Sequence, residues 1–305
     1  MKTFMFHRFH DIKNIPTGQG SFSARNLDDF IKREGEEKFF KIDDINKLKN
    51  GESTHIKKVL LTFDDGLNSQ YETAKPVLDK YGIKSFWFIY TKIFEQNFDL
   101  NELLNFFISR YYSDFDKFFQ KFIFFCNGVE HHWQSNDYKI YSKDLYSKFN
   151  FYSEFDMRFR FLRNRVLSHE QFKEIVIKLF KSEDFKYQEV SKKLWLNEHK
   201  VKNLINEGHE VGLHSHNHPF TISNYSKSKQ FDEYKTNYDI LKSITDIEPT
   251  SVAYPLGSFN KDTLEIMHQL KIQIGFRSSW CTIDKILDSI SYNLLLPRFD
   301  SASIK

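Results

Sequence analysis

The sequence has few of the residues that would define a disulfide-rich or repetitive protein. Its 305 residues include two cysteines, Cys126 and Cys281, which form no C-x-x-C pair. A disulfide framework is therefore not expected. The sequence also lacks internal repeats and low-complexity tails, and its length is sufficient to bury a full-sized core.

Long apolar runs and a large excess of one charge are absent as well. No apolar segment approaches the ~20 residues that span a membrane, and the N-terminus lacks the apolar core of a secretory signal. We therefore expect a cytoplasmic protein without a transmembrane segment. Its 44 basic and 41 acidic side chains give a net charge of +3, which argues against nucleic acid as a partner. The sequence leaves the oligomeric state open.

Two adjacent aspartates interrupt an apolar predicted strand. Residues 59–66 read Val-Leu-Leu-Thr-Phe-Asp-Asp-Gly, so Asp64 and Asp65 stand at the end of this strand. Burying a carboxylate is costly unless it is paired or binds a metal. Gly66 permits a sharp turn at the strand end, the usual place for a site in α/β sheets and barrels. Both carboxylates are therefore candidates for catalysis or metal binding.

A histidine-rich segment follows another predicted strand, at residues 210–213. His214, His216 and His218 lie within five positions directly after it. One aspartate and two histidines are a common ligand set for a catalytic zinc, which lowers the pKa of a bound water toward about 7. An alternative ligand pair, His214 with His216, would suggest an amidohydrolase-like site.

Together the two segments resemble the first two motifs of the polysaccharide deacetylases, the NodB-homology carbohydrate esterases. Residues 62–66 match TFDDG, and residues 214–218 match H-[S/T]-x-x-H. The resemblance implies an α/β fold, a deformed (β/α)7 barrel, with Asp64 as the catalytic base. It also implies a divalent metal, with Zn2+ expected and Co2+, Ni2+ or Fe2+ possible. The ligands that it implies are Asp65, His214 and His218.

The third motif of the family, R-x-P-Y-G, matches less well. Residues 251–257 have Ala253 in place of its arginine and Leu256 in place of its tyrosine. In the family that arginine orients the base, and a nearby backbone N–H holds the oxyanion. The resemblance makes Tyr254, Pro255 and Leu256 candidate substrate-binding residues. Arg298 is a candidate replacement for the missing arginine.

The general acid of many family members, a C-terminal Leu-His pair, is also missing. Phe6-His7 instead resembles the Tyr-His strand end of the poly-N-acetylglucosamine-type deacetylases, in which this histidine is the acid. Strand alternation places Met5, His7 and Phe9 on one face, so that His7 would face the barrel mouth. His10 is the alternative acid. Trp280 lies near the position where the family has a tryptophan that lines the acetyl pocket.

The sequence contains 33 phenylalanines, and most of this excess lies between the two motifs. Asp65 and His214 are 149 positions apart, far more than a compact barrel needs. We predict a helical insertion at residues 94–199 in a barrel formed by residues 1–93 and 200–305. Apolar residues at helical spacing predict amphipathic helices near 115–122 and 172–179. The insertion is expected to pack on itself and on the barrel, with a lid or a substrate-binding surface as the alternative.

The remaining sequence alternates between helices and strands, as in a βα barrel. Helices are predicted at residues 68–80, 225–244 and 261–270. Strands are predicted at residues 84–90, 251–254, 272–276 and 293–296.

The sequence thus predicts a metal-dependent hydrolase that removes an N-acetyl group from a carbohydrate. A cytoplasmic location would favour a glycan precursor, such as a nucleotide- or lipid-linked sugar. One alternative is a catalytically silent member of the fold that binds sugar, because the arginine and the Leu-His pair are missing. A second is a two-His-one-carboxylate metal oxygenase, although such enzymes usually place the carboxylate two residues from the first histidine.

Overall fold

The structure is a computed structural model that describes residues 1–11, 14–18, 20–49, 58–95, 100–148, 152–279 and 292–304. The chain forms two compact units. The barrel unit consists of Met1–Phe98 and Lys193–Lys305, and the helical unit of Asp99–Lys192.

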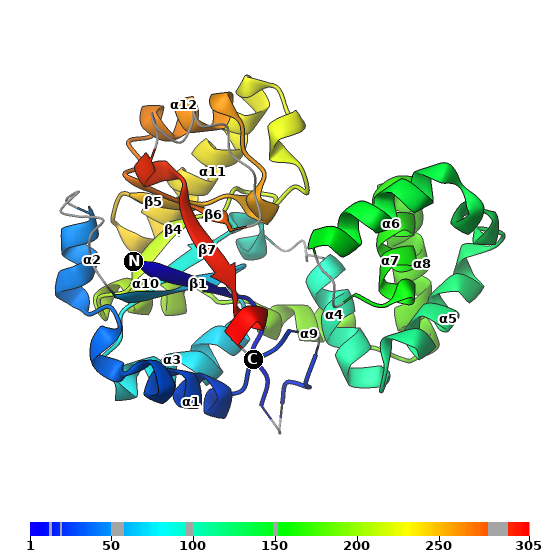
Figure 1. Ribbon diagram of the computed structural model, residues 1–305, viewed down its shortest axis with the longest axis horizontal. Coiled ribbons are helices and arrows are strands. Elements are labelled where there is room, and N and C mark those ends of the chain that lie inside the picture. Colours follow the sequence, from blue (N-terminus) through cyan, green and yellow to red (C-terminus); the bar gives the residue numbers. More distant parts are fainter. Residues whose placement is uncertain are drawn as a thin grey trace. The chain divides into compact units, whose positions relative to one another are not determined.

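Seven parallel strands close into a barrel in sequence order, which confirms the expected deformed (β/α)7 architecture. Figure 1 shows the first strand, in dark blue, beside the last strand, in red, where the barrel closes. The strands are β1 (Lys2–Phe6), β2 (Val59–Asp64), β3 (Phe86–Ile89), β4 (Glu210–Leu213), β5 (Ser251–Ala253), β6 (Ile274–Ser278) and β7 (Leu296–Asp300). The prediction of a strand at residues 293–296 was wrong in position, because residues 292–294 form a short 3-10 helix and β7 begins only at Leu296.

The strands are apolar on both faces because both faces are covered. Every residue of β2, β3 and β4 is buried, as expected for parallel strands inside an α/β fold. One face fills the barrel interior with a cluster that includes Leu60, Phe86, Phe88, Ile274 and Phe276. The other face packs against the surrounding helices with a cluster that includes Leu61, Phe63, Trp87, Val211 and Leu213.

Helices cover the outside of the barrel. They are α1 (Ala24–Glu34), α2 (Ile42–Lys49), α3 (Lys75–Lys80), α10 (Glu198–Asn206), α11 (Lys227–Thr245) and α12 (Lys261–Gln269), and a π-helical segment at Gln70–Ala74 leads into α3. The helices predicted at 68–80, 225–244 and 261–270 are confirmed, with small shifts at their ends.

Helix α2 closes the N-terminal end of the barrel. Its residues Ile45 and Leu48 pack on the interior cluster. At the same end, the Lys49 ammonium lies 2.9 Å from the carboxylate of Glu210, the first residue of β4. The C-terminal ends of the strands therefore form the mouth of the barrel, where the sequence motifs lie.

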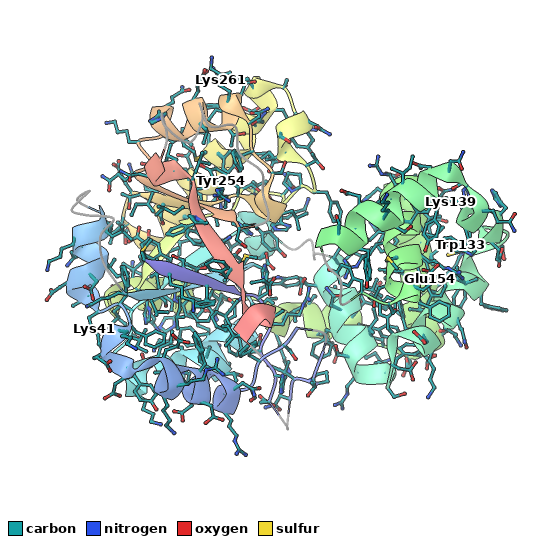
Figure 2. All side chains as sticks on the ribbon, viewed as in Figure 1. Lys41, Trp133, Lys139, Glu154, Tyr254 and Lys261 are labelled. Carbon is teal, nitrogen blue, oxygen red and sulfur yellow. The ribbon has the colours of Figure 1, made fainter. Side chains whose placement is uncertain are left out.

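The helical unit has an aromatic core of its own. It contains α4 (Leu100–Tyr111), α5 (Phe115–Cys126), α6 (Asn136–Lys148), α7 (Glu154–Phe161), α8 (His169–Ser182) and most of α9 (Tyr187–Leu194). The ring of Phe122 lies 5.0 Å from that of Phe159, and both side chains are buried. The Arg158 side chain bonds Glu154 and lies over the ring of Trp133; Figure 2 labels Glu154 and Trp133 in this unit. The predicted amphipathic helices are confirmed as α5 and α8.

None of the helices in the described part of the chain is long and apolar enough to cross a membrane.

Candidate active site

The aspartate pair and Gly66 form a tight turn at the end of β2, which we call the aspartate turn. Asp64 is the last residue of the strand, and Asp65 has a backbone φ of 74°. This left-handed conformation costs a non-glycine residue roughly 1–2 kcal/mol, and such strain tends to occur at functional sites. Gly66 follows with a φ of 64°, which explains why glycine occupies this position. Asp64 thus keeps the strand conformation while Asp65 departs from it.

Asp65 meets two histidines from the loop that follows β4. Its Oδ1 atom lies 3.4 Å from Nε2 of His214 and 3.4 Å from Nε2 of His218. All three groups offer a ligand atom within one small cluster. Oδ1 of Asp65 is buried and has no hydrogen-bond partner among the described residues.

These three residues fit a divalent cation. Tetrahedral zinc with bonds of about 2.0–2.1 Å places its ligand atoms roughly 3.3 Å apart, close to the observed separations. Nδ1 of His214 donates a hydrogen bond of 2.8 Å to the backbone carbonyl of Ala253, which leaves Nε2 available as a ligand. Burial alone would raise the pKa of Asp65, but His214 and His218 outweigh burial and lower it. Asp65 is therefore ionised, as a metal ligand must be.

Asp64 has a different partner. Arg298 from β7 forms a bidentate pair with it, with Nη1 2.6 Å from Oδ1 and Nη2 2.8 Å from Oδ2. Nη1 also donates to the hydroxyl of Thr62, and the guanidinium lies over the ring of Phe88. Arg298 is only 1% exposed. Burial raises the pKa of Asp64, but the charge of Arg298, aided by His214 and His7, lowers it below the ordinary value.

His7 lies beside the same carboxylate. Its Nε2 atom is 3.8 Å from Oδ2 of Asp64, and its side chain is 36% exposed. His10, the alternative acid, has its Nδ1 atom 2.8 Å from the hydroxyl of Ser21. The predicted alternation from Met5 to Phe9 was wrong, because β1 ends at Phe6 and the ring of Phe9 stacks on that of Phe6 in the outer core.

His216 is turned away from the group formed by Asp65, His214 and His218. Its Nδ1 atom lies 3.0 Å from the hydroxyl of Thr91, and its Nε2 atom lies 3.1 Å from a carboxylate oxygen of Glu95. The backbone N–H of Lys92 donates to the carbonyl of His216. Residues 91–95, which we call the outgoing stem, lead from β3 toward the helical unit. The contacts of Thr91, Lys92 and Glu95 with His216 join this stem to residues 214–218, which we call the histidine loop.

The segment that leads back from the helical unit to the barrel is hydrogen-bonded to the aspartate turn. The backbone N–H of Leu196 donates to the carbonyl of Gly66 at 2.9 Å, and Trp195 forms an antiparallel bridge with Leu67. Residues 195–196 form the return stem. Each half of the site is thus held by one of the two stems of the insertion.

Asn237 on α11 supports the histidine loop and had no signal in the sequence. Its Oδ1 atom accepts the backbone N–H of His214 at 2.8 Å, and its Nδ2 atom donates to the carbonyl of Ile89. Nδ2 also lies 3.3 Å from the hydroxyl of Thr91. A lone asparagine in a polar helix cannot be distinguished in sequence from a surface residue. Here it is fully buried and joins the ends of β3 and β4.

The third motif lies at the end of β5. Tyr254 is buried in the outer core, where its ring lies 5.0 Å from that of Phe259; Figure 2 labels Tyr254. Pro255 is buried, and Leu256 is 47% exposed with a left-handed φ of 51°. A substrate contact of these three residues remains a prediction. Trp280 lies outside the described residues.

A second group of metal-ligand type lies at the opposite end of the barrel. It consists of Asp79, Glu207 and His209, and the last of these precedes β4. The Lys75 ammonium bonds both carboxylates and so supplies the positive charge there. Burial lowers the pKa of His209 to about 3, so this histidine is neutral. We assign this group a structural role.

The fold is similar to that of several solved deacetylases. The Streptococcus pyogenes deacetylase PplD, in complex with acetate, aligns with a TM-score of 0.55 and 17% identity over 98% of this chain and 91% of that chain. A de-N-acetylase from Aggregatibacter actinomycetemcomitans aligns with a TM-score of 0.54 and 13% identity over 98% and 93%. IcaB from Ammonifex degensii aligns with a TM-score of 0.53 and 15% identity over 99% and 93%.

No curated protein matches the chain at a significant level. The sequence profile of the family described as polysaccharide deacetylase matches residues 51–114 and 167–275, which is more than half of the chain. The match spans the aspartate turn, the histidine loop and the third motif, all of which meet at the mouth of the barrel. The chain therefore belongs to the polysaccharide deacetylase family.

Proposed function

We propose that the protein is a metal-dependent hydrolase that removes an N-acetyl group from a carbohydrate. The observation that carries the proposal is the environment of Asp64. This carboxylate is paired with Arg298, has His7 at 3.8 Å, and adjoins the Asp65, His214 and His218 group without belonging to it. A base and an acid therefore stand next to a group that fits a cation.

Asp64 acts as the general base in this proposal. Its pKa is lowered, so it is ionised near neutral pH and can accept a proton from the attacking water. Arg298 holds both carboxylate oxygens, which keeps the base in one orientation. A carboxylate bound to a cation accepts a proton poorly, so the unbound Asp64 is better suited to this role than Asp65.

His7 acts as the general acid. Cleavage of the C–N bond releases acetate and an amine, and the amine nitrogen must gain a proton as it leaves. A partly exposed imidazole can donate this proton and regain it from solvent.

Asp65, His214 and His218 would hold the cation. When bound, a divalent metal supplies Lewis-acid polarisation of the acetyl carbonyl and lowers the pKa of water. Zinc is the proposed ion because the set contains one carboxylate and two imidazoles, and cobalt, nickel or iron are alternatives.

The features that favoured a silent member of the fold are weakened by two contacts. Position 253 lacks arginine, but Arg298 is paired with the aspartate instead. The Leu-His pair is missing, but His7 lies at the same carboxylate. We therefore favour an enzyme over a sugar-binding protein.

The test is acetate release from N-acetylated sugars by metal-free protein before and after addition of zinc, cobalt, nickel or ferrous iron. The panel should contain chitin-type and poly-N-acetylglucosamine oligomers, together with nucleotide- and lipid-linked sugars, since the expected glycan precursor remains a prediction. Metal-dependent release from at least one compound supports the proposal. Sugar binding without release would favour a silent protein, and an oxygen requirement would favour an oxygenase.

A further inference from the structure

Gln70 joins the main chains of the two residues to which we assign acid–base roles. Its Nε2 atom donates to the backbone carbonyl of His7 at 2.7 Å and to that of Asp64 at 2.5 Å. The side chain is fully buried. A carboxamide nitrogen has two N–H groups, and these two carbonyls take both of them.

These two hydrogen bonds lie just past the point where the backbone pairing of β1 with β2 ends. The parallel ladder between β1 and β2 ends with Phe6 opposite Phe63. The next pair in register would be His7 and Asp64, but the ladder does not extend to this pair. The Gln70 amide replaces the missing ladder bonds at this position.

The local backbone presents Gln70 to both carbonyls. Gln70 is the first residue of the π-helical segment Gln70–Ala74, and such wide turns occur frequently at functional sites. The hydroxyl of the preceding residue, Ser69, accepts the backbone N–H of Phe9 at 3.4 Å. The start of this helix thus holds the segment after β1 at two points.

We propose that Gln70 is a positioning residue that fixes His7 relative to Asp64, an inference that rests on the function proposed above. Gln70 itself does not reach the reacting atoms. Its effect is to hold the acid and the base at their separation of 3.8 Å, just past the last residue pair of the β1–β2 ladder. Misplacement of a catalytic group by 1 Å can cost about 10²-fold in rate.

The variant Gln70→Met keeps the length and the burial of the side chain and removes both donors. We expect kcat for an N-acetyl sugar to fall about 30- to 100-fold while KM changes less than about threefold. An aryl acetate ester has a leaving group that needs no proton, so its hydrolysis should change less than about threefold. A merely structural loss would lower both activities together.

Gln230→Met is the matched control. Gln230 is equally buried and also bridges two groups, the carbonyl of Tyr225 and the hydroxyl of Thr263, neither of which belongs to the site described above. This variant should lower the denaturation midpoint and leave the ratio of amide to ester activity unchanged.

A double-mutant cycle with His7→Ala tests whether Gln70 acts through His7 or independently of it. If Gln70 acts through His7, adding Gln70→Met to His7→Ala should cause little further loss of amide hydrolysis. Additive losses, or equal loss of amide and ester hydrolysis in Gln70→Met, would overturn the proposal.

A crystal structure of Gln70→Met gives a result that does not depend on activity. We expect the distance between Nε2 of His7 and Oδ2 of Asp64 to lengthen well beyond the present 3.8 Å. An unchanged distance would overturn the inference. If the wild-type protein hydrolyses neither substrate, the proposed function fails, and this distance alone decides the positioning role.

Discussion

Arg298 on β7 holds Asp64 on β2 by both of its terminal nitrogens, inside the barrel and away from solvent. The family resemblance places an arginine at position 253 on β5, where this chain has alanine. The backbone carbonyl of Ala253 accepts a hydrogen bond from His214 instead. The positive partner of the aspartate therefore comes from a different strand, and position 253 serves the other half of the site.

Replacing Arg298 by methionine should shift the acid limb of the kcat/KM profile to higher pH. Burial raises the pKa of Asp64, and Arg298 is the largest influence that lowers it. Without the guanidinium the pKa rises, less of the base is ionised at neutral pH, and kcat/KM at pH 7 should fall at least about tenfold. Arg277→Met on β6 is the control, because Arg277 donates hydrogen bonds to the backbone carbonyls of Leu295 and Ser278.

The same variant should change how stability depends on pH. A carboxyl whose folded pKa is depressed stabilises the fold above its unfolded pKa, and this contribution is lost as pH falls through the folded pKa. Arg298→Met should therefore show a smaller loss of unfolding free energy between neutral and acid pH than the wild type. Identical acid limbs and identical acid unfolding in the two proteins would contradict the assigned role of the pair.

Asp64→Asn and Asp65→Asn should separate turnover from metal binding. Asp64→Asn removes the base but none of the three proposed ligands, so it should retain metal and lose at least about 10²-fold in kcat. Asp65→Asn should lose metal during dialysis against a weak chelator. Metal content by elemental analysis, measured beside acetate release, checks both. Normal activity of metal-loaded Asp64→Asn would remove Asp64 from the base role.

Thr91→Val should weaken metal binding although Thr91 is not a ligand. Its hydroxyl joins Asn237 to His216, and Asn237 in turn holds the backbone of His214. Loss of groups that support metal ligands typically costs 10- to 100-fold in affinity, and we expect about tenfold here. The measurement is zinc affinity by competition with a chelating dye.

Thr250→Val is the control for this prediction. Its hydroxyl bonds Glu210 at the N-terminal end of the barrel, away from the mouth. Equal zinc affinity of Thr91→Val and the wild type would show that the outgoing stem does not support the histidine loop.

Gly212→Ala should destabilise the barrel by overpacking. A Cβ atom at this position would lie 2.3 Å from the hydroxyl of Ser251 and 2.6 Å from the ring of Phe88. Inserting a methyl group into such a packed site typically costs about 1–3 kcal/mol. Denaturant unfolding measures the loss. Because Phe88 also lies under the Arg298 guanidinium, we expect a lower kcat as well.

The sequence was sufficient to predict the barrel and the proximity of its two main motifs. Asp65 and His214 each follow a buried strand, and parallel strands bring such positions to one end of a barrel. Arg298 was a candidate replacement for the missing arginine because it lies near the end of the predicted barrel. The prediction for Phe9 failed because alternation holds only while the strand continues.

The supporting residues could not be predicted from the sequence. None of the three supporting residues, Gln70, Thr91 and Asn237, belongs to a motif. Gln70 bonds the carbonyl of His7, which lies just past the end of β1, and the other two bond residues more than a hundred positions away. Their roles depend on where the strands stop, which is set by tertiary packing and not by local pattern. The φ of 74° at Asp65 could not be predicted either, because Gly66 indicates a turn but does not show which neighbouring residue adopts the strained conformation.

The helical insertion also determines when the site can be completed during synthesis. The aspartate turn leaves the ribosome 149 residues before His214, and Arg298 follows close to the C-terminal end. At about 5–20 residues per second, roughly 7–30 s separate the two halves of the proposed metal site. Asp64 and Asp65 must wait in the nascent chain without their partners while the helical unit is made. The proposed ligand set can therefore be complete only after the helical unit has been made.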